Sequence, residues 1–157
     1  MINENFKIVP IAHNEAITGG VTCDSINMSG YHKATFLFLF DTLATASCVM
    51  TVNSGATDGA TTSALYFNYA FGSAAEPNAD CDVLADWTNV NTLTITHGTY
   101  SDYMLVVEVD AAAMDIANNE EWLTILFTDP GTATGNITGF AILQPRYSSN
   151  QSASALA

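Results

Sequence analysis

The side chains best suited to bind a metal ion lie in the short acidic stretch from Asn78 to Asp86. Asp80, Asp82 and Asp86 present three carboxylates at spacings of two and four, and Ca²⁺ takes six to eight oxygen ligands of this type. The glycine and the terminal glutamate of an EF-hand loop are missing from the stretch. We therefore expect a solvated acidic loop, keep calcium binding by these three aspartates as the weaker alternative, and predict no cofactor.

Catalytic residues are not indicated by any spacing in the chain. His13, His32 and His97 lie in no HExxH or HxH pattern, and the sequence has no GxSxG elbow, no GxGxxG and no GxxxxGK[ST]. Glu108, Glu120 or Glu121 could in principle form the carboxylate pair of a glycosidase, but the sequence supplies no geometry for it. We predict that the protein is not an enzyme.

Two further residue types have simple expected roles. Cys23, Cys48 and Cys81 are odd in number and widely spaced, which favours small buried thiols over a zinc site. Arg146 is the only cation after Ala34, in a segment with 13 carboxylates. We expect it to pair with one of them, and the alternative is a solvated charge at a strand end.

The composition limits the classes of partner. The chain of 157 residues has 16 acidic and 3 basic residues, a net charge of −13, and only 12% charged residues. Phosphate backbones and anionic membranes require clustered cations, so we expect neither as a partner. No apolar run is long enough to span a bilayer and no signal peptide is evident. We expect a soluble protein made in the cytoplasm, with one domain over residues 1–147 and a flexible arm over 148–157.

Short β-prone runs separated by Gly, Asn, Asp and Ser dominate the chain, a pattern typical of an all-β sandwich. We predict an antiparallel, jelly-roll-like β-sandwich with at most one short helix, which would lie between Asp110 and Glu121 with Asp110 as its N-cap. The nine predicted strands are Phe6 to Ala12, Val21 to Met28, Lys33 to Phe40, Ser47 to Val52, Ala64 to Phe71, Thr92 to His97, Tyr103 to Val109, Trp122 to Thr128 and Thr138 to Leu143.

Some of these strands are apolar on both faces, as in Phe36 to Phe40 and Met104 to Val107. One face of an antiparallel sandwich sheet normally meets water, so such strands need a second cover, either a loop or another subunit. We therefore expect a closed homo-oligomer, with a trimer as the leading case. The residues expected in the core or a subunit interface are Phe36, Phe38, Phe40, Leu65, Phe67, Leu105, Val107, Leu123, Ile125 and Phe127.

Three segments resemble a known group of proteins. Asn5 to Pro10, followed by Ile26 to Phe40 with its Tyr-His-Lys and Thr-Phe-Leu motifs, is similar to the capsid decoration (cement or head auxiliary) proteins of tailed bacteriophages. The acidic turn at Asp110 to Asp115 and the strand at Glu121 to Ile125 resemble the same group. The resemblance implies a β-sandwich that coats or cements the capsid, commonly as a trimer, with no catalytic residues.

The expected function is thus a structural role on the capsid surface of a virion, with the major capsid protein as partner. A carbohydrate-binding β-sandwich, such as an adhesin, is the alternative from another class, and a small jelly-roll hydrolase is the least supported. The interface candidates are Tyr31, Lys33, Phe36, Arg146 and Tyr147. The sugar-stacking candidates of the alternative are Tyr66, Trp87, Tyr100, Tyr103 and Trp122.

Overall fold

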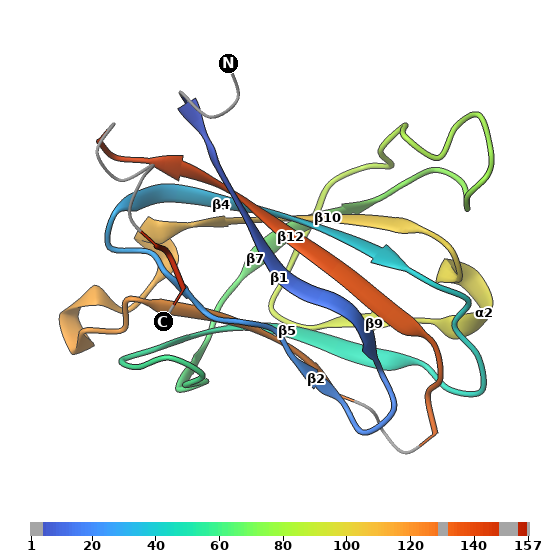
Figure 1. Ribbon diagram of the computed structural model, residues 1–157, viewed down its shortest axis with the longest axis horizontal. Coiled ribbons are helices and arrows are strands. Elements are labelled where there is room, and N and C mark those ends of the chain that lie inside the picture. The colour runs from blue at the N-terminus through green and yellow to red at the C-terminus, as the bar shows by residue number, and fades with distance from the viewer. Residues whose placement is uncertain (1–4, 129–131, 148–153, 157) are drawn as a thin grey trace.

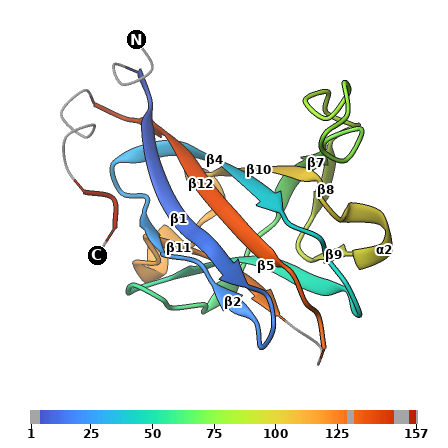
Figure 2. The ribbon, with the colours of Figure 1, turned by 45° about the vertical axis from the view of Figure 1, so that its right-hand side comes forward.

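Two antiparallel sheets pack face to face in the computed structural model, which describes residues 5–128, 132–147 and 154–156 (Figures 1 and 2). Sheet A has the strand order β1 (Lys7–Ala16), β12 (Asn136–Pro145), β4 (Tyr31–Phe40), β10 (Met104–Asp110), β7 (Phe67–Phe71), β8 (Thr88–Val90). Sheet B has the order β2 (Val21–Thr22), β11 (Trp122–Thr128), β5 (Cys48–Gly55), β6 (Ser63–Ala64), with β3 (Ile26–Asn27) also paired to β11 and β9 (Leu93–Ile95) to β5.

The strand pairings are nested. The first strand, β1, pairs with the last, β12; β2 and β3 pair with β11; β4 pairs with β10; and β5 pairs with β9. A long antiparallel ribbon rolled up in this way is a jelly roll. The segment from β6 to β8 departs from the nested order, because β7 pairs with β10 and widens sheet A. The predicted all-β, jelly-roll-like sandwich is confirmed.

The period-two pattern of the sequence decides which side chains enter the core. On β4, Phe36, Phe38 and Phe40 are buried, while Leu37 and Leu39 face outward. Phe38 packs edge-on against Phe127 of sheet B with ring centroids 5.1 Å apart, which joins the two sheets at the centre of the core. All ten residues that the sequence places in the core or an interface are buried.

The helical content is small and differs in place from the expectation. Asp110 caps as predicted, since its side chain accepts a hydrogen bond from Ala112 N at 2.8 Å. The residues after it form two 3₁₀ turns, Ala111–Ala113 and Ile116–Asn118, rather than one helix. They are separated by Met114 in an extended conformation, which buries its side chain. The four-residue helix α2 (His97–Tyr100) and the short edge strand β8 were not predicted.

Two residues of the expected C-terminal arm, Ala155 and Leu156, pack against the domain. Asn27 N donates to Ala155 O at 2.9 Å, and Ala155 is buried against β3 with Leu156 packed beside the core. Residues 148–153 and 157 of that arm lie outside the described residues. Among the helices of the described chain, none has the length and apolarity needed to cross a membrane.

Candidate functional site

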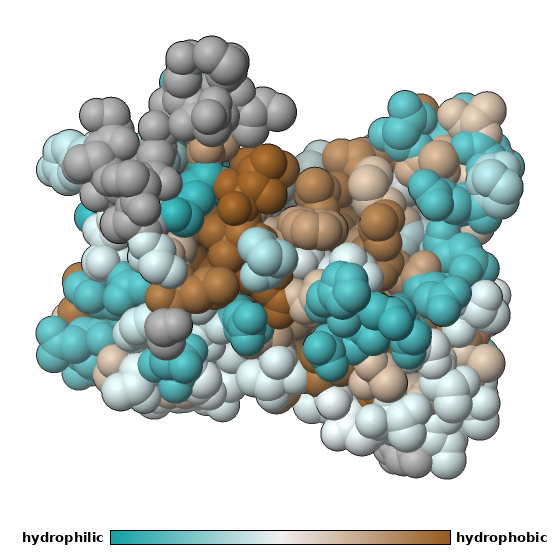
Figure 3. All heavy atoms as spheres, viewed as in Figure 1, coloured by the Kyte–Doolittle hydropathy of each residue, from teal (hydrophilic) through white to brown (hydrophobic). Residues whose placement is uncertain are grey.

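An exposed apolar surface lies on the outside of sheet A and is the feature of the fold that core packing does not explain. It consists of Ile8, Leu37, Leu39, Phe140 and Ile142, hereafter the outer apolar face. Ile8, Leu39 and Phe140 are 54%, 44% and 38% exposed, and Leu37 and Ile142 are half-buried. Figure 3 shows apolar side chains gathered over β1, β12 and β4. Patches of this kind on a soluble domain mark interaction sites.

Strand register makes the outer apolar face continuous. Ile8 on β1 lies opposite Ile142 on β12, and Phe140 on β12 lies opposite Leu37 on β4. Side chains paired across neighbouring strands in this way contact each other. Beyond β4 the same row passes to Val106 on β10, which is buried. The most exposed apolar side chains therefore lie on β1, β12 and β4, and the half-buried Met104 of β10 adjoins them opposite Leu39.

The border of the outer apolar face is polar and nearly neutral. Lys33 and Glu108, on adjacent strands, form a salt bridge. Thr35 and Gln144 lie beside this pair, and a hollow of about 250 Å³ opens between them, Phe6 and Ile142. Because Lys33 is compensated by Glu108, the surface adds almost no net charge in a protein whose total charge is −13.

The three cations of the chain gather at one end of sheet A. Lys7 lies opposite Leu143, Lys33 lies opposite Gln144, and Arg146 directly follows β12. The other end, where β4 stops and the β7–β8 connection begins (Figure 1), has only negative charges among its ionised groups. These are Glu15, Asp41, Glu76, Asp80, Asp82, Asp86 and Asp102. The end near Lys33 thus repels another acidic protein least.

The interface candidates chosen from the sequence divide into accessible and inaccessible residues. Phe36 and Tyr31 are 1% and 3% exposed, so both belong to the core, although Tyr31 also borders a pocket described below. Tyr147 is exposed, and Lys33 is part of the border described above. Arg146 Nε donates to the carbonyl oxygen of Tyr31 at 3.0 Å. The predicted ion pair of Arg146 is not found among the described residues, where a carbonyl takes the place of the carboxylate.

The calcium alternative is not supported by the geometry. Asp80, Asp82 and Asp86 are all exposed, and no group of three or more His, Cys, Asp or Glu side chains in the described residues is arranged to hold a metal ion. Asn78 Oδ1 accepts a hydrogen bond from Asp80 N at 3.2 Å. The stretch is an acidic loop that consists mainly of turns.

The aromatic candidates for sugar stacking do not form one platform. Tyr100 stacks on Phe71 with centroids 3.7 Å apart, and Tyr103 meets Tyr100 edge-on, so both rings are engaged within the domain. Tyr66 and Trp87 are exposed. Trp122, in contrast, lines a pocket of about 380 Å³ together with Asn27. The sequence did not indicate Asn27 as a binding residue, because its position opposite Trp122 depends on the pairing of β3 with β11.

The outer apolar face was foreseen only in part. The doubly apolar pattern of Phe36 to Phe40 indicated that β4 needs a cover, and Leu37 and Leu39 are the outward residues of that pattern. Ile8 and Phe140 join them through the pairing of β1, β12 and β4. Ile8 and Phe140 alternate with buried neighbours, and this pattern indicated that their side chains point outward. It did not indicate that they lie beside Leu37 and Leu39.

No known protein family and no curated protein matches this chain. Among solved structures it is similar to the SPBc2 prophage-derived protein YomS, with 10% identity over 88% of this chain and 93% of that one and a TM-score of 0.34. It is also similar to VP2 in a subviral particle of infectious bursal disease virus, with 10% identity over 89% of this chain and 41% of that one and a TM-score of 0.21. Similarities at these TM-scores assign neither a family nor a function.

Proposed function

We propose that this protein is a non-catalytic structural component of a tailed-phage virion that decorates or cements the outer surface of the capsid. The observation that carries the proposal is the outer apolar face, on which Ile8, Leu39 and Phe140 are exposed. Jelly rolls serve viral capsid and lectin domains alike, so the fold alone does not select a function. An uncovered apolar sheet face favours a protein that works inside an assembly.

Within this proposal the outer apolar face contacts a second copy of the chain in a closed homotrimer. Two copies with a net charge of −13 each repel one another. The neutral border around Lys33 and Glu108 lets them approach through this face at the lowest electrostatic cost. Closed symmetry is the usual form of homo-oligomers, and it covers the face on every subunit.

The proposed partner of the trimer is the major capsid protein, and neither nucleic acid nor membrane takes part. Terminal segments are the proposed docking elements, because a chain end can add a strand to an exposed sheet edge. Each such contact must exceed the entropy lost on ordering, and three equivalent contacts in one trimer raise the effective concentration. The protein would thus reside on the capsid surface.

Oligomeric state tests the role of the outer apolar face. Light scattering at micromolar concentration in physiological salt is expected to give three times the chain mass of 16.7 kDa. The double variant Leu39→Ser, Phe140→Ser is expected to be monomeric, since it removes two of the three most exposed apolar side chains of the face. Tyr66→Ser is the matched control, because Tyr66 is 64% exposed but lies outside the face. A monomeric wild-type protein would reject the trimer.

Sedimentation with undecorated phage heads tests the function itself. The full chain is expected to bind heads, and versions lacking residues 1–5 or 148–157 are expected to bind more weakly. If the full chain fails to bind, the capsid proposal is wrong. If both truncated versions bind as well as the full chain, only docking through the termini is wrong. If the wild-type protein is monomeric and the double variant Leu39→Ser, Phe140→Ser does not bind heads, the outer apolar face contacts the capsid rather than a second copy of the chain.

A further inference from the structure

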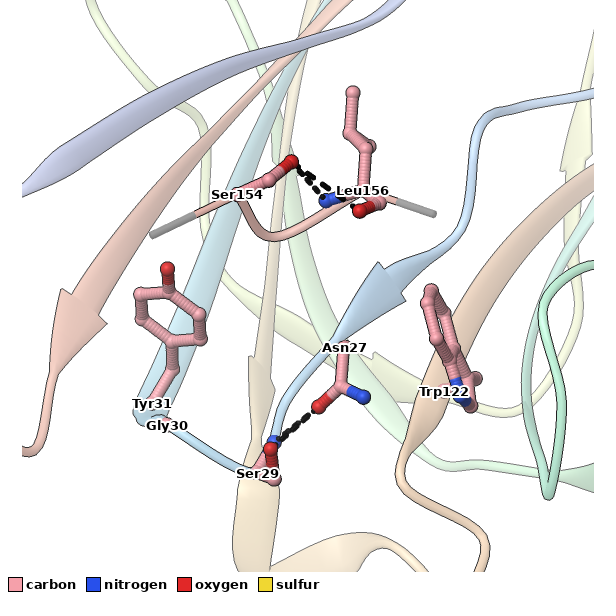
Figure 4. Close-up of a pocket in the computed structure, with 7 residues that line it drawn as sticks. All are labelled: Asn27, Ser29, Gly30, Tyr31, Trp122, Ser154 and Leu156. Atoms are coloured by element: carbon pink, nitrogen blue, oxygen red, sulfur yellow. Dashed lines mark hydrogen bonds between the residues drawn. The ribbon is translucent and has the colours of Figure 1, made fainter. Parts of the chain in front are cut away.

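A second surface feature lies where sheet B meets the start of β4, and its described lining residues are not part of the outer apolar face. It is the pocket of about 380 Å³ between β3, the start of β4, the start of β11 and the docked C-terminal residues (Figure 4). In Figure 4 the rings of Tyr31 and Trp122 stand on opposite sides, and Asn27 and Ser29 lie between them. Its lining residues are Asn27, Ser29, Gly30, Tyr31, Trp122, Ser154 and Leu156.

Strand pairing brings the two central residues together from positions 95 apart in the chain. Asn27 on β3 lies directly opposite Trp122 on β11. Their neighbours Ile26 and Leu123 point into the core and are buried, so Asn27 and Trp122 both point outward, side by side. On the other side of Trp122 the opposite residue is Gly55 of β5, which packs against Ala60.

The amide of Asn27 is held in one orientation. Its Oδ1 accepts hydrogen bonds from Ser29 N at 3.0 Å and from Ser29 Oγ at 2.6 Å. A backbone N–H can only donate, so the oxygen must face Ser29 and the NH₂ group must face away. In Figure 4 that nitrogen lies on the side of Trp122. A hydrogen-bond donor is thus fixed beside an aromatic ring at the wall of the pocket.

Among the described residues that line the pocket, none has an ionised side chain, although the protein has 16 acidic residues. Burial raises the pKa of the Tyr31 phenol, so that ring is also neutral. The described lining residues thus offer no carboxylate to a cation and no cation to an anion, and an anion is also repelled by the net charge of −13. A neutral ligand with a ring-shaped apolar face and several hydroxyl groups fits both the indole and the amide.

We propose that this pocket binds one pyranose unit of a neutral glycan, with the C–H face of the sugar ring packed on Trp122 and its hydroxyl groups hydrogen-bonded by Asn27 and Ser29. Glycan binding does not require the outer apolar face, because none of the described lining residues of the pocket belongs to that face. A capsid-bound protein with this pocket would be an adhesin as well as a structural component.

The two tryptophans of the chain provide the test. Trp87 is exposed and outside the pocket, so its indole N–H is an internal control for that of Trp122. The experiment records both indole signals in ¹H–¹⁵N correlation spectra of the full chain, assigned with Trp87→Phe. The probes are the methyl glycosides of glucose, galactose and N-acetylglucosamine, each raised to about 50 mM, with galacturonic acid as the charged comparison.

At least one neutral glycoside is expected to shift the Trp122 signal saturably and leave that of Trp87 unchanged, and galacturonic acid is expected to bind at least about fivefold more weakly. Asn27→Ala is expected to weaken binding about tenfold, the loss of one to two hydrogen bonds. Asn89→Ala, which removes an exposed asparagine on β8, is expected to leave binding unchanged. The same spectra report whether each variant is folded. A Trp122 signal that none of the neutral glycosides moves, or that moves only together with the Trp87 signal, overturns the proposal.

Discussion

Glu120 is the buried carboxylate of the described residues, and its partners are hydroxyl groups rather than a cation. Its side chain accepts hydrogen bonds from Ser54 Oγ at 2.5 Å and Ser63 Oγ at 3.1 Å, and Ser54 is itself fully buried. Glu120→Ala leaves both donors without their acceptor, which is expected to lower the free energy of unfolding by about 1.5–3 kcal/mol. Denaturant titration measures this change. The neighbouring Glu121 is exposed, so Glu121→Ala should stay within about 0.5 kcal/mol of the wild type.

The cysteines should differ in reactivity according to their burial. Burial raises the pKa of the Cys23 thiol from 9.0 to about 12, with further contributions from Asp24 and Glu15. Cys48 is equally buried, and Cys81 is partly exposed. With a thiol reagent at pH 8 we expect Cys81 alone to react in the native protein and all three to react in denaturant. Rapid labelling of Cys23 without denaturant would contradict this.

The same pKa shift has a consequence for stability at high pH. The unfolded thiol of Cys23 ionises near pH 9.0 and the native thiol near 12, so the native state holds its proton over this interval and the unfolded state does not. This group therefore contributes its full stability below pH 9, and that contribution falls as the pH rises from 9 toward 12. Cys23→Ala is expected to show a weaker decline of the melting temperature over this interval.

Strand β12 is positioned by the absence of a side chain at Gly139. A Cβ added there would lie 2.6 Å from Phe38 Cε1 and 3.3 Å from Ile11 Cγ1. Phe38 is fully buried against Phe127 and cannot move aside. Gly139→Ala is thus expected to destabilise the protein by about 1–3 kcal/mol through overpacking. Gly98→Ala in α2 meets no atom within 4 Å and is the control, with unchanged or slightly higher stability. Equal melting temperatures for the two variants would contradict the close packing of β12 on β4.

The charge of the whole molecule predicts its response to salt. A net charge of −13 creates self-repulsion that ions screen, and the end of sheet A where β4 stops carries seven carboxylates without a cation. The melting temperature is expected to rise between low and moderate ionic strength. Because the described residues hold no metal cluster, Ca²⁺ and Mg²⁺ at equal ionic strength should act alike. A clearly larger effect of Ca²⁺ would point back to Asp80, Asp82 and Asp86.

The sequence predicted those properties of the structure that depend on a local residue pattern, namely the strand positions and the side chains that face the core. The alternation of apolar and polar residues located most strands within a few positions and assigned the inward residues of β4, β10 and β11. It succeeded because a strand in a two-layer fold must bury every second side chain, whatever its neighbours are. The same logic indicated that the outward residues Leu37 and Leu39 lack a cover.

The sequence by itself determined the all-β class, the core residues and the acidic, thinly charged surface. Composition and the two-residue alternation of apolar side chains do not depend on the order in which the strands pair. Only the tertiary structure decided which strands lie side by side. The nested pairing gathers Ile8, Leu39 and Phe140 into one face and sets Asn27 against Trp122. It also buries Tyr31 and Phe36, which the sequence analysis had named as interface candidates. Pairing between strands that are far apart in the sequence depends on the packing of the whole core and on the entropy of loop closure. A local residue pattern indicates neither of these.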